Sequence, residues 1–291
     1  MPSVYQIITD QIITALEQGV VPWHKPWSGG GAPANYISKR PYSGINTLLL
    51  GLSDYAAPYW MTYKQAQQAG GQVRKGEKSR MVTFWKKLTD GEDSEDGRPR
   101  FMMRYYRVFN VEQVDGIDYK PAAFDPVEFN HDSDPIVSAY ANGPSIITGG
   151  GRACYSPKMD QVNMPEPGAF DTLKHYRATL YHELVHSTGH TSRLDRGLNK
   201  PAAFGSPSYA QEELIAEIGA CFLNNKAGID SDEVFDNSTA YIGSWLKRLR
   251  DDSRLVITAA SKAQKAADYI AADVEQVKPE PIAADLFELA A

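Results

Sequence analysis

The sequence of 291 residues lacks the features that define several large classes of protein. Its longest aliphatic run, at residues 45–52, is far too short to cross a bilayer as a helix. Its first residues have neither the basic start nor the apolar core of a signal peptide. Only two cysteines are present, Cys154 and Cys221, so no disulfide framework forms. We therefore expect a reduced, cytoplasmic protein.

Charge is distributed unevenly along the chain. The net charge is −6, yet residues 1–89 carry ten basic and four acidic side chains, or +6. The remaining residues carry 20 basic and 32 acidic side chains, or −12. Four of the five tryptophans also lie in that first third: Trp23, Trp27, Trp60 and Trp85. Because the length exceeds that of one typical core, we expect two domains with separate tasks, at residues 1–125 and 126–291.

The hydrophobic pattern of the N-terminal part predicts a small α+β domain. Caps or apolar stripes indicate three helices, which begin near Ser3, Ile45 and Thr62. Strands are expected at residues 72–74, 81–85 and 101–109. The turn at 75–78 would join the first two strands as a hairpin with a cationic tip, and an acidic loop at 90–97 would precede the third.

The C-terminal part is expected to be mainly helical with a short sheet. We predict one extended edge at residues 153–164, where two prolines limit pairing. A helix beginning at Asp171 or Thr172 carries most of the histidines, and the next opens with a capping box of Ser208 and Gln211. Two further helices are expected near 237–250 and 254–271. The chain as a whole is thus predicted to be α+β, with a small α+β domain followed by a mainly helical domain that has a short sheet.

Residues 182–186 read His-Glu-Leu-Val-His, the pattern of zincin metal-dependent hydrolases. On a helix, His182 and His186 lie one turn apart on the same face, so both imidazoles reach one metal ion. Glu183 lies beside that ion, where its carboxylate takes a proton from a water molecule. We therefore interpret Glu183 as the catalytic base. The alternatives are a chance match on an amphipathic helix and a site that holds metal without cleaving a substrate.

Two histidines leave a tetrahedral zinc ion one protein ligand short. Position 192 holds serine where one zincin subgroup has a third histidine, so the ligand must come from elsewhere. We choose Glu213 on the following helix, with Glu217 as the outer partner of a ligating imidazole. Glu212 is the competing ligand, since a one-residue step rotates the helix face by about 100°. Zn²⁺ is expected, although Mn²⁺ or another divalent metal also suits these ligands.

Other polar side chains near this motif have open roles. His190, His175, Tyr181 and Tyr209 are candidate donors to an oxyanion, and the sequence does not rank them. For His190 and His175, a position in the packing around the site is expected rather than direct ligation.

Cationic and aromatic side chains interleave over residues 36–87, as single-stranded nucleic acid requires. Cations follow the phosphates, and flat rings stack on unpaired bases with little preference for base identity. The alternative is that many of these rings are core, and we expect this of Phe84 and Tyr105. The candidate nucleic-acid-binding residues are Lys39, Arg40, Tyr42, Trp60, Lys64, Arg74, Lys75, Lys78, Arg80 and Trp85.

Several longer motifs are similar to those of a known family. They are Pro22-Trp-His-Lys-Pro-Trp27, Pro41-Tyr-Ser-Gly-Ile-Asn46, Trp60-Met-Thr-Tyr-Lys-Gln-Ala66, Gly70-Gly-Gln-Val-Arg-Lys-Gly-Glu-Lys78, Tyr181-His-Glu-Leu-Val-His-Ser-Thr-Gly-His190 and Glu212-Glu-Leu-Ile-Ala-Glu217. Together they resemble the ArdC-type antirestriction proteins of conjugative plasmids, whose N-terminal domain also occurs in TraC-type primases. The resemblance implies a domain that binds single-stranded DNA, a zincin-like domain, and protection of incoming plasmid DNA from restriction enzymes.

Two other functions stay open. One is a cytoplasmic metallopeptidase that uses DNA for recruitment and cleaves host or DNA-bound proteins of unknown identity. The other is a DNA-binding module whose metal site only stabilises the C-terminal fold.

Overall fold

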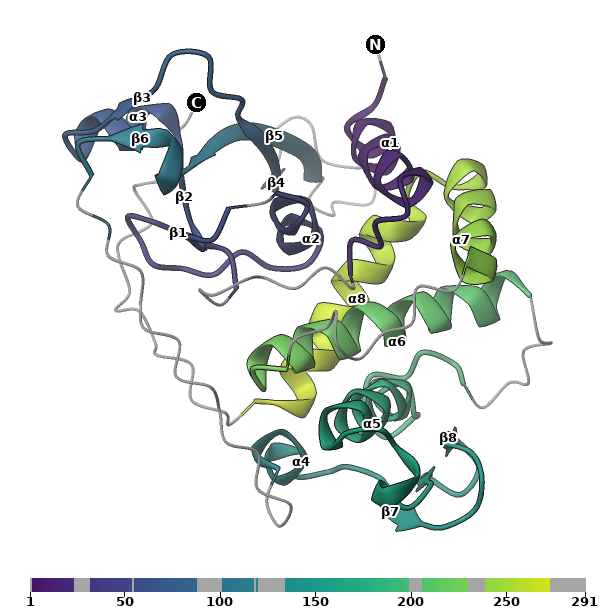
Figure 1. The fold of residues 1–291 in the computed structure, drawn as a ribbon. Helices are drawn as coiled ribbons and strands as arrows, with labels where there is room; N and C mark the ends of the chain where they lie inside the picture. The colour runs from purple at the N-terminus through teal and green to yellow at the C-terminus, as the bar shows by residue number, and fades with distance from the viewer. Residues whose placement is uncertain are drawn as a thin grey trace.

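A computed structural model describes residues 2–23, 32–53, 55–87, 101–117, 119, 134–198, 206–229 and 239–272. Within them the chain combines helices with several small sheets, which confirms the predicted α+β class (Figure 1). The acidic loop predicted at 90–97 and the domain boundary at 125 lie outside the described residues.

The N-terminal helices begin where their caps predict. Helix α1 (Val4–Glu17) starts after Ser3, whose hydroxyl accepts a hydrogen bond from the Gln6 amide. Gly19 follows this helix with a φ of 77°, as expected at a left-handed helix end. Helix α2 (Ile45–Gly51) is buried over most of its length. A capping box of Thr62 and Gln65 opens helix α3 (Tyr63–Gln68).

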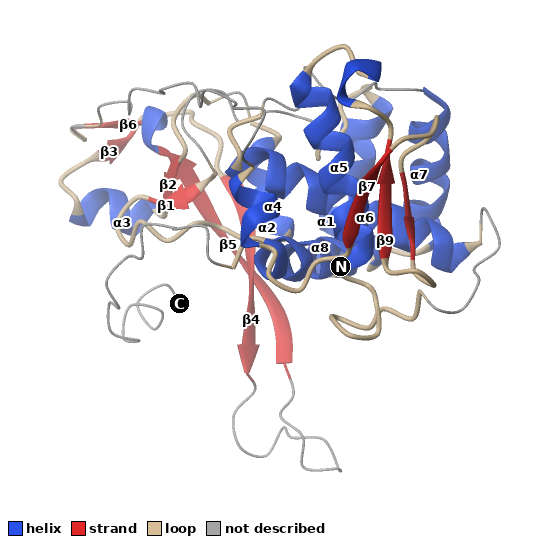
Figure 2. Ribbon diagram, turned by 90° about the horizontal axis from the view of Figure 1, so that it is seen from below, coloured by secondary structure: helices blue, strands red, loops and turns tan. Residues whose placement is uncertain are grey.

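The N-terminal strands form one four-stranded sheet and one small pair. The larger sheet has the order β1-β2-β5-β4, from Ala34–Asn35, Tyr59–Met61, Phe101–Asn110 and Arg80–Lys87. Strand β3 (Gln72–Val73) pairs with β6 (Val114–Asp115), which follows a short 3₁₀ helix, η1, at Val111–Gln113. The predicted hairpin of β3 with β4 is therefore wrong, because β3 pairs with the distant β6 and β4 pairs with the next strand, β5. Figure 2 shows the long β4–β5 ribbon projecting from the molecule.

The C-terminal half opens with helix α4 (Pro135–Ala139) and a three-stranded sheet of order β7-β9-β8. These strands are Ser145–Thr148, Gln161–Met164 and Cys154–Ser156. The single edge predicted at 153–164 is wrong, since the segment turns back on itself and β9 lies in the middle of the sheet. Asp160 makes this turn possible with a left-handed φ of 48°.

Four longer helices complete the fold, after the 3₁₀ helix η2 (Pro167–Ala169). They are α5 (Leu173–Ser187), α6 (Pro207–Lys226), α7 (Thr239–Asp251) and α8 (Leu255–Ile270). Thr172 caps α5 as predicted. The cap of α6 is Ser206 and not Ser208, because Pro207 occupies the first helical position, where its fixed φ suits a helix start.

The main hydrophobic core joins both halves of the chain. Buried side chains of α1 and α2 pack in one cluster with those of α5, α6 and α8. Helix α6 packs against both α5 and α8 in the middle of this cluster (Figure 1). Two smaller clusters lie on opposite faces of the N-terminal sheet at β2, one around Met61 and one around Trp60. Among the described helices, none is both long and apolar enough for a membrane span.

Candidate metal centre and nucleic-acid surface

A close contact between α5 and α6 sets the geometry of the predicted metal site. A Cβ atom added to Gly219 of α6 would lie 2.8 Å from both γ-carbons of Val185 on α5. Only glycine therefore permits this approach without a shift of one helix. The contact lies next to His186 on α5 and two turns beyond Glu212 and Glu213 on α6, so it fixes the distance between the two sets of side chains.

The structure brings His182, His186 and Glu213 together. Their ligand atoms all lie within 4.8 Å of one another. The two imidazole Nε2 atoms are 3.1 Å apart, and each lies 3.7 Å from an oxygen of Glu213. Tetrahedral zinc with bonds of about 2.0–2.1 Å places its donor atoms roughly 3.4 Å apart. The three side chains therefore fit a divalent cation in both donor type and spacing.

The charges around the site favour a cation. Burial alone lowers the pKa of His182, but the Glu213 hydrogen bond and the charges of Glu217 and Glu183 outweigh it and raise the pKa to about 9. Burial alone would raise the pKa of Glu213, yet its contacts with His182, His186 and Tyr209 lower it. Without metal, a proton on the imidazole thus balances the surrounding carboxylates, which is the role that a metal ion takes over.

Glu212 binds the outer nitrogen of His186. The Nδ1 atom lies 3.3 Å from Glu212 Oε1, so with Nε2 turned to the metal the ring donates its Nδ1 proton to this carboxylate. Arg196 holds the same carboxylate through two contacts, from Nε at 2.9 Å and Nη2 at 2.6 Å. The guanidinium also donates to Thr188 and to the Val185 carbonyl. His186 is therefore fixed by a buried acid–base pair.

Glu183 is fixed by the sheet. Its Oε2 accepts a 2.8 Å hydrogen bond from the Tyr155 amide of β8, which lies against α5. Within the described residues the other oxygen, Oε1, has no hydrogen-bond partner. The carboxylate is thus oriented by one oxygen and leaves the other able to accept a proton.

The remaining predicted residues lie around this centre. His190 bonds Ser192 through Nδ1 at 2.7 Å, and His175 bonds the capping hydroxyl of Thr172 at 2.8 Å, so neither belongs to the three-residue cluster. Glu217 acts on His182 through its charge, while the carboxylate bound to the outer nitrogen of His186 is Glu212. Sequence reasoning missed Arg196, because a lone arginine in a loop carries no spacing signal.

The predicted DNA-binding residues divide into exposed and buried groups. Trp60 is only 2% exposed and packs against Tyr55, so it cannot stack on a base. The hydroxyl of Tyr42 is buried, and its ring packs against the same small cluster as Trp60. The inclusion of Trp60 was wrong, because its ring fills the core, whereas Tyr42 is half-buried beside that core and stays a prediction. Trp85 is 54% exposed on the projecting ribbon.

All of the predicted cations are exposed, but Arg74 and Lys39 have partners within the fold. Arg74 bonds Glu77, Asp115 and the Glu112 carbonyl, so its charge is largely paired within the fold. Lys39 lies over the rings of two tyrosines. The other predicted cations are Arg40, Lys64, Lys75, Lys78 and Arg80.

The β4–β5 ribbon carries an aromatic face that was only partly predicted. The register pairs Trp85 with Met103, so Trp85 shares a face with Phe101, Tyr105 and Arg107. Phe101 and Tyr105 are 55% and 44% exposed, and the Arg107 guanidinium lies 5.8 Å from the Tyr105 ring centroid. Tyr105 is thus not core as expected, whereas Phe84 is half-buried against Tyr106. We call Trp85, Phe101, Tyr105 and Arg107 the ribbon face.

Comparisons with known proteins match both halves of the chain. The family described as "Zincin-like metallopeptidase" matches residues 136–262, and "N-terminal domain of anti-restriction factor ArdC" matches residues 2–109. Two DNA primases TraC of Escherichia coli are 37% identical over 92% of this chain. The chain spans only 27% and 20% of their lengths.

Two crystal structures of the antirestriction protein ArdC from plasmid R388 are also similar, one metal-free and one Mn(II)-bound. Both are 39% identical to this chain with a TM-score of 0.77, and the match covers 94% and 95% of this chain and 99% and 100% of theirs. A relative of this identity, matched over its full length, shares the family. The chain belongs to the ArdC family of antirestriction proteins.

Proposed function

We propose that His182, His186 and Glu213 hold a catalytic divalent metal ion. The observation that carries this proposal is the convergence of two imidazoles and one carboxylate from neighbouring helices, at the spacing that a tetrahedral ion requires. Zn²⁺ suits this donor set, and the Mn(II)-bound structure of the R388 relative supports Mn²⁺ as another occupant. The Glu212–Arg196 pair holds His186 in its ligating orientation.

Glu183 acts as the general base of a hydrolase. A divalent ion in this site lowers the pKa of water and polarises a carbonyl group. The Tyr155 amide holds Oε2 of Glu183, so Oε1 accepts the proton from the attacking water. The same carboxylic acid then donates that proton to the leaving nitrogen. The substrate of this hydrolase is a host or DNA-bound protein, in which it cleaves a peptide bond.

The N-terminal part, residues 1–125, binds single-stranded DNA. The ribbon face offers rings for stacking, and the exposed cations Arg40, Lys75, Lys78 and Arg80 lie on the same part of the chain to follow phosphates. The similarity to TraC primases supports a nucleic-acid partner. Residues 126–291 form the metallopeptidase-like part. Together they protect incoming plasmid DNA from host restriction.

Plasmid transfer into restricting and non-restricting recipients tests this function. Wild type, Glu183→Gln and Trp85→Ala are compared, with metal content and folding measured for each. We expect Glu183→Gln to keep its metal and to lose protection in the restricting recipient. Equal protection by Glu183→Gln and wild type would reject a catalytic role.

Equal protection by Glu183→Gln and wild type is also what the alternative function predicts, which is a DNA-binding module with a structural metal. The close contact between α5 and α6 at Gly219 supports this alternative function, because a metal ion held between the two helices would also stabilise their packing. In that case Glu183→Gln protects fully, while removal of metal lowers the melting temperature.

A further inference from the structure

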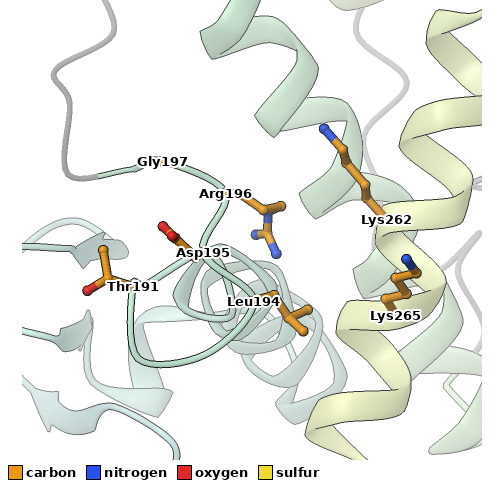
Figure 3. A pocket seen from close by; sticks show the side chains of 7 residues that line it. All are labelled: Thr191, Leu194, Asp195, Arg196, Gly197, Lys262 and Lys265. Carbon is orange, nitrogen blue, oxygen red and sulfur yellow. The ribbon is translucent and has the colours of Figure 1, made fainter. Parts of the chain in front are cut away.

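A hollow of about 740 Å³ lies between α8 and the loop that follows α5, and none of His182, His186 and Glu213 lines it. The loop residues 191–197 form one wall, and Lys262 and Lys265 of α8 form the other. Figure 3 shows both lysines extending from α8, with Arg196 opposite them on the loop. A space of this size is in the range that admits a nucleotide-sized ligand.

The charge of this pocket is unbalanced. Lys262 and Lys265 are three residues apart, so they lie on the same face of α8. In the part of the chain that the structure describes, neither ammonium group has a hydrogen-bond or ion-pair partner. Asp268, one turn further along, accepts a hydrogen bond from Gln264 instead. In Figure 3 the carboxylate of Asp195 extends away from α8. Among the described residues the two ammonium groups are therefore not ion-paired, and both are available to an anionic ligand.

Arg196 lines the pocket, but its charge is paired with Glu212. Its guanidinium is fixed on Glu212 and on the end of α5, and its side chain is only 7% exposed. A ligand in the pocket would therefore rely on the lysine ammonium groups for direct contacts. Lysines bind phosphate as point charges and adapt to its tetrahedral oxygens, whereas paired carboxylate recognition favours a free arginine fork.

The N-terminal part of the chain packs against another face of the helix that carries the two pocket lysines. Gln264, between the two lysines in sequence, accepts a 3.0 Å hydrogen bond from the Gly44 amide through Oε1. The exposed Arg40 is four residues before Gly44, which is at most about 14 Å of extended chain. A single strand of a few nucleotides spans this distance. Gln264 projects from a different face of α8 than Lys262 and Lys265, so a strand that contacts both sets of cations must also cross the width of this helix, about 10–12 Å.

We infer that this pocket takes a backbone phosphate of the single-stranded DNA whose neighbouring nucleotides lie on the N-terminal part. The inference rests on the proposed DNA binding and adds to it a contact made by the metallopeptidase-like part. It places the DNA strand beside the Arg196–Glu212 pair that orients His186. Free inorganic phosphate shares this chemistry, so the test separates the two sources.

The experiment measures binding of fluorescent oligo(dT), from about 4 to about 16 nucleotides long, to the full chain at several salt concentrations. The test variant is Lys262→Ala/Lys265→Ala. The control is Lys158→Ala/Lys247→Ala, which removes the same charge from exposed positions that do not line the pocket. Melting temperatures establish that each protein is folded, and Lys262→Arg/Lys265→Arg restores charge.

We expect the test variant to bind the longer oligonucleotides about five- to tenfold more weakly. Its salt slope should be smaller by roughly 0.7 for each phosphate that the lysines no longer neutralise. The control variant should bind like wild type, and the arginine variant should recover most of the affinity. Equal affinity and slope for the test variant and wild type would overturn the inference.

A second arm titrates inorganic phosphate against bound oligo(dT) at constant ionic strength. Displacement of DNA only from proteins that keep both lysines supports a shared phosphate site. Phosphate binding to the pocket with no change in DNA affinity would overturn the DNA assignment. Failure of the proposed function is distinct, because wild type itself would then not bind oligo(dT).

Discussion

The α5–α6 pair and the β4–β5 ribbon place their functional side chains in opposite ways. At the helix pair, imidazoles and carboxylates converge between two packed helices and stay partly exposed. Glu212 holds His186, and the Tyr155 amide holds Glu183. On the projecting ribbon, rings such as Trp85 are about half exposed, although Trp85 also contacts Tyr5 of α1. A metal site needs donors fixed at short distances, whereas stacking on varied bases needs accessible faces. The two regions therefore respond differently to substitution.

The largest expected effect is on the metal. His186→Ala removes one of three donors, so its loss in metal affinity should exceed the roughly 10–100-fold typical of an outer partner. His190→Ala is the control, because His190 bonds Ser192 outside the cluster. Metal analysis after gel filtration should find metal in the control and none in His186→Ala. A His186→Ala protein with one metal per chain would contradict the site.

Trp60 and Trp85 offer the sharpest contrast between core and surface. Trp60→Ala should lower the free energy of unfolding by about 3–5 kcal/mol, because it leaves a cavity beneath the sheet. Trp85→Ala should change unfolding little and should weaken binding of oligo(dT) by about 1–3 kcal/mol. Urea unfolding and fluorescence anisotropy measure the two quantities. The reverse pattern would show that the ribbon is not a stacking surface.

Glu212→Gln tests the outer partner of the metal centre. The amide loses the charge that accepts from both His186 and Arg196, so metal affinity should fall about 10–100-fold. Competition with a chelator measures this. Gln211→Ala, at the preceding position, should keep the affinity of wild type. An unchanged affinity in Glu212→Gln would remove the Glu212–Arg196 pair from the site.

A smaller effect is expected at the turn that precedes β9. The Arg193 guanidinium beside Asp160 lowers the pKa of that carboxyl group, and Arg193 itself is buried. A carboxyl group with a lowered folded-state pKa stabilises the fold above its unfolded pKa of about 3.9, and this contribution is lost as pH falls through the folded-state value.

Asp160→Asn should therefore lower the free energy of unfolding by about 1–2 kcal/mol relative to wild type at pH 7. The effect is no larger because Asp160 is one-third exposed, so water screens its charge. Urea unfolding should show this difference shrinking below about pH 4. A difference that stays constant with pH would mean that packing, not charge, holds the turn.

Local signals in the sequence predicted the helices well and the strand partners poorly. Caps such as Ser3 and Thr62 act within one turn, so the sequence shows where α1 and α3 begin. The partner of β3 is β6, some forty residues later, and no local turn indicates that pairing. Trp60 and Trp85 both lie on strands, and only the tertiary position of each strand decides which ring is buried.

The candidate site was predictable where its chemistry depends on helical spacing. His182 and His186 are one turn apart, and the incomplete donor set directs attention to acids on the next helix, such as Glu213. The role of Glu212 was not predictable, since a step of one residue turns a helical side chain by about 100°. The packing of α5 and α6 at Gly219 decides that Glu212, and not Glu213, faces Nδ1 of His186. Arg196 comes from a loop, where no periodicity applies.

Anomalous diffraction from crystals grown with Zn²⁺ or Mn²⁺ tests the central claim most directly. The account predicts one strong peak bonded to Nε2 of His182, Nε2 of His186 and a carboxylate oxygen of Glu213, each about 2.0–2.2 Å away. A peak elsewhere, or one that the Glu213 carboxylate does not contact, would contradict it.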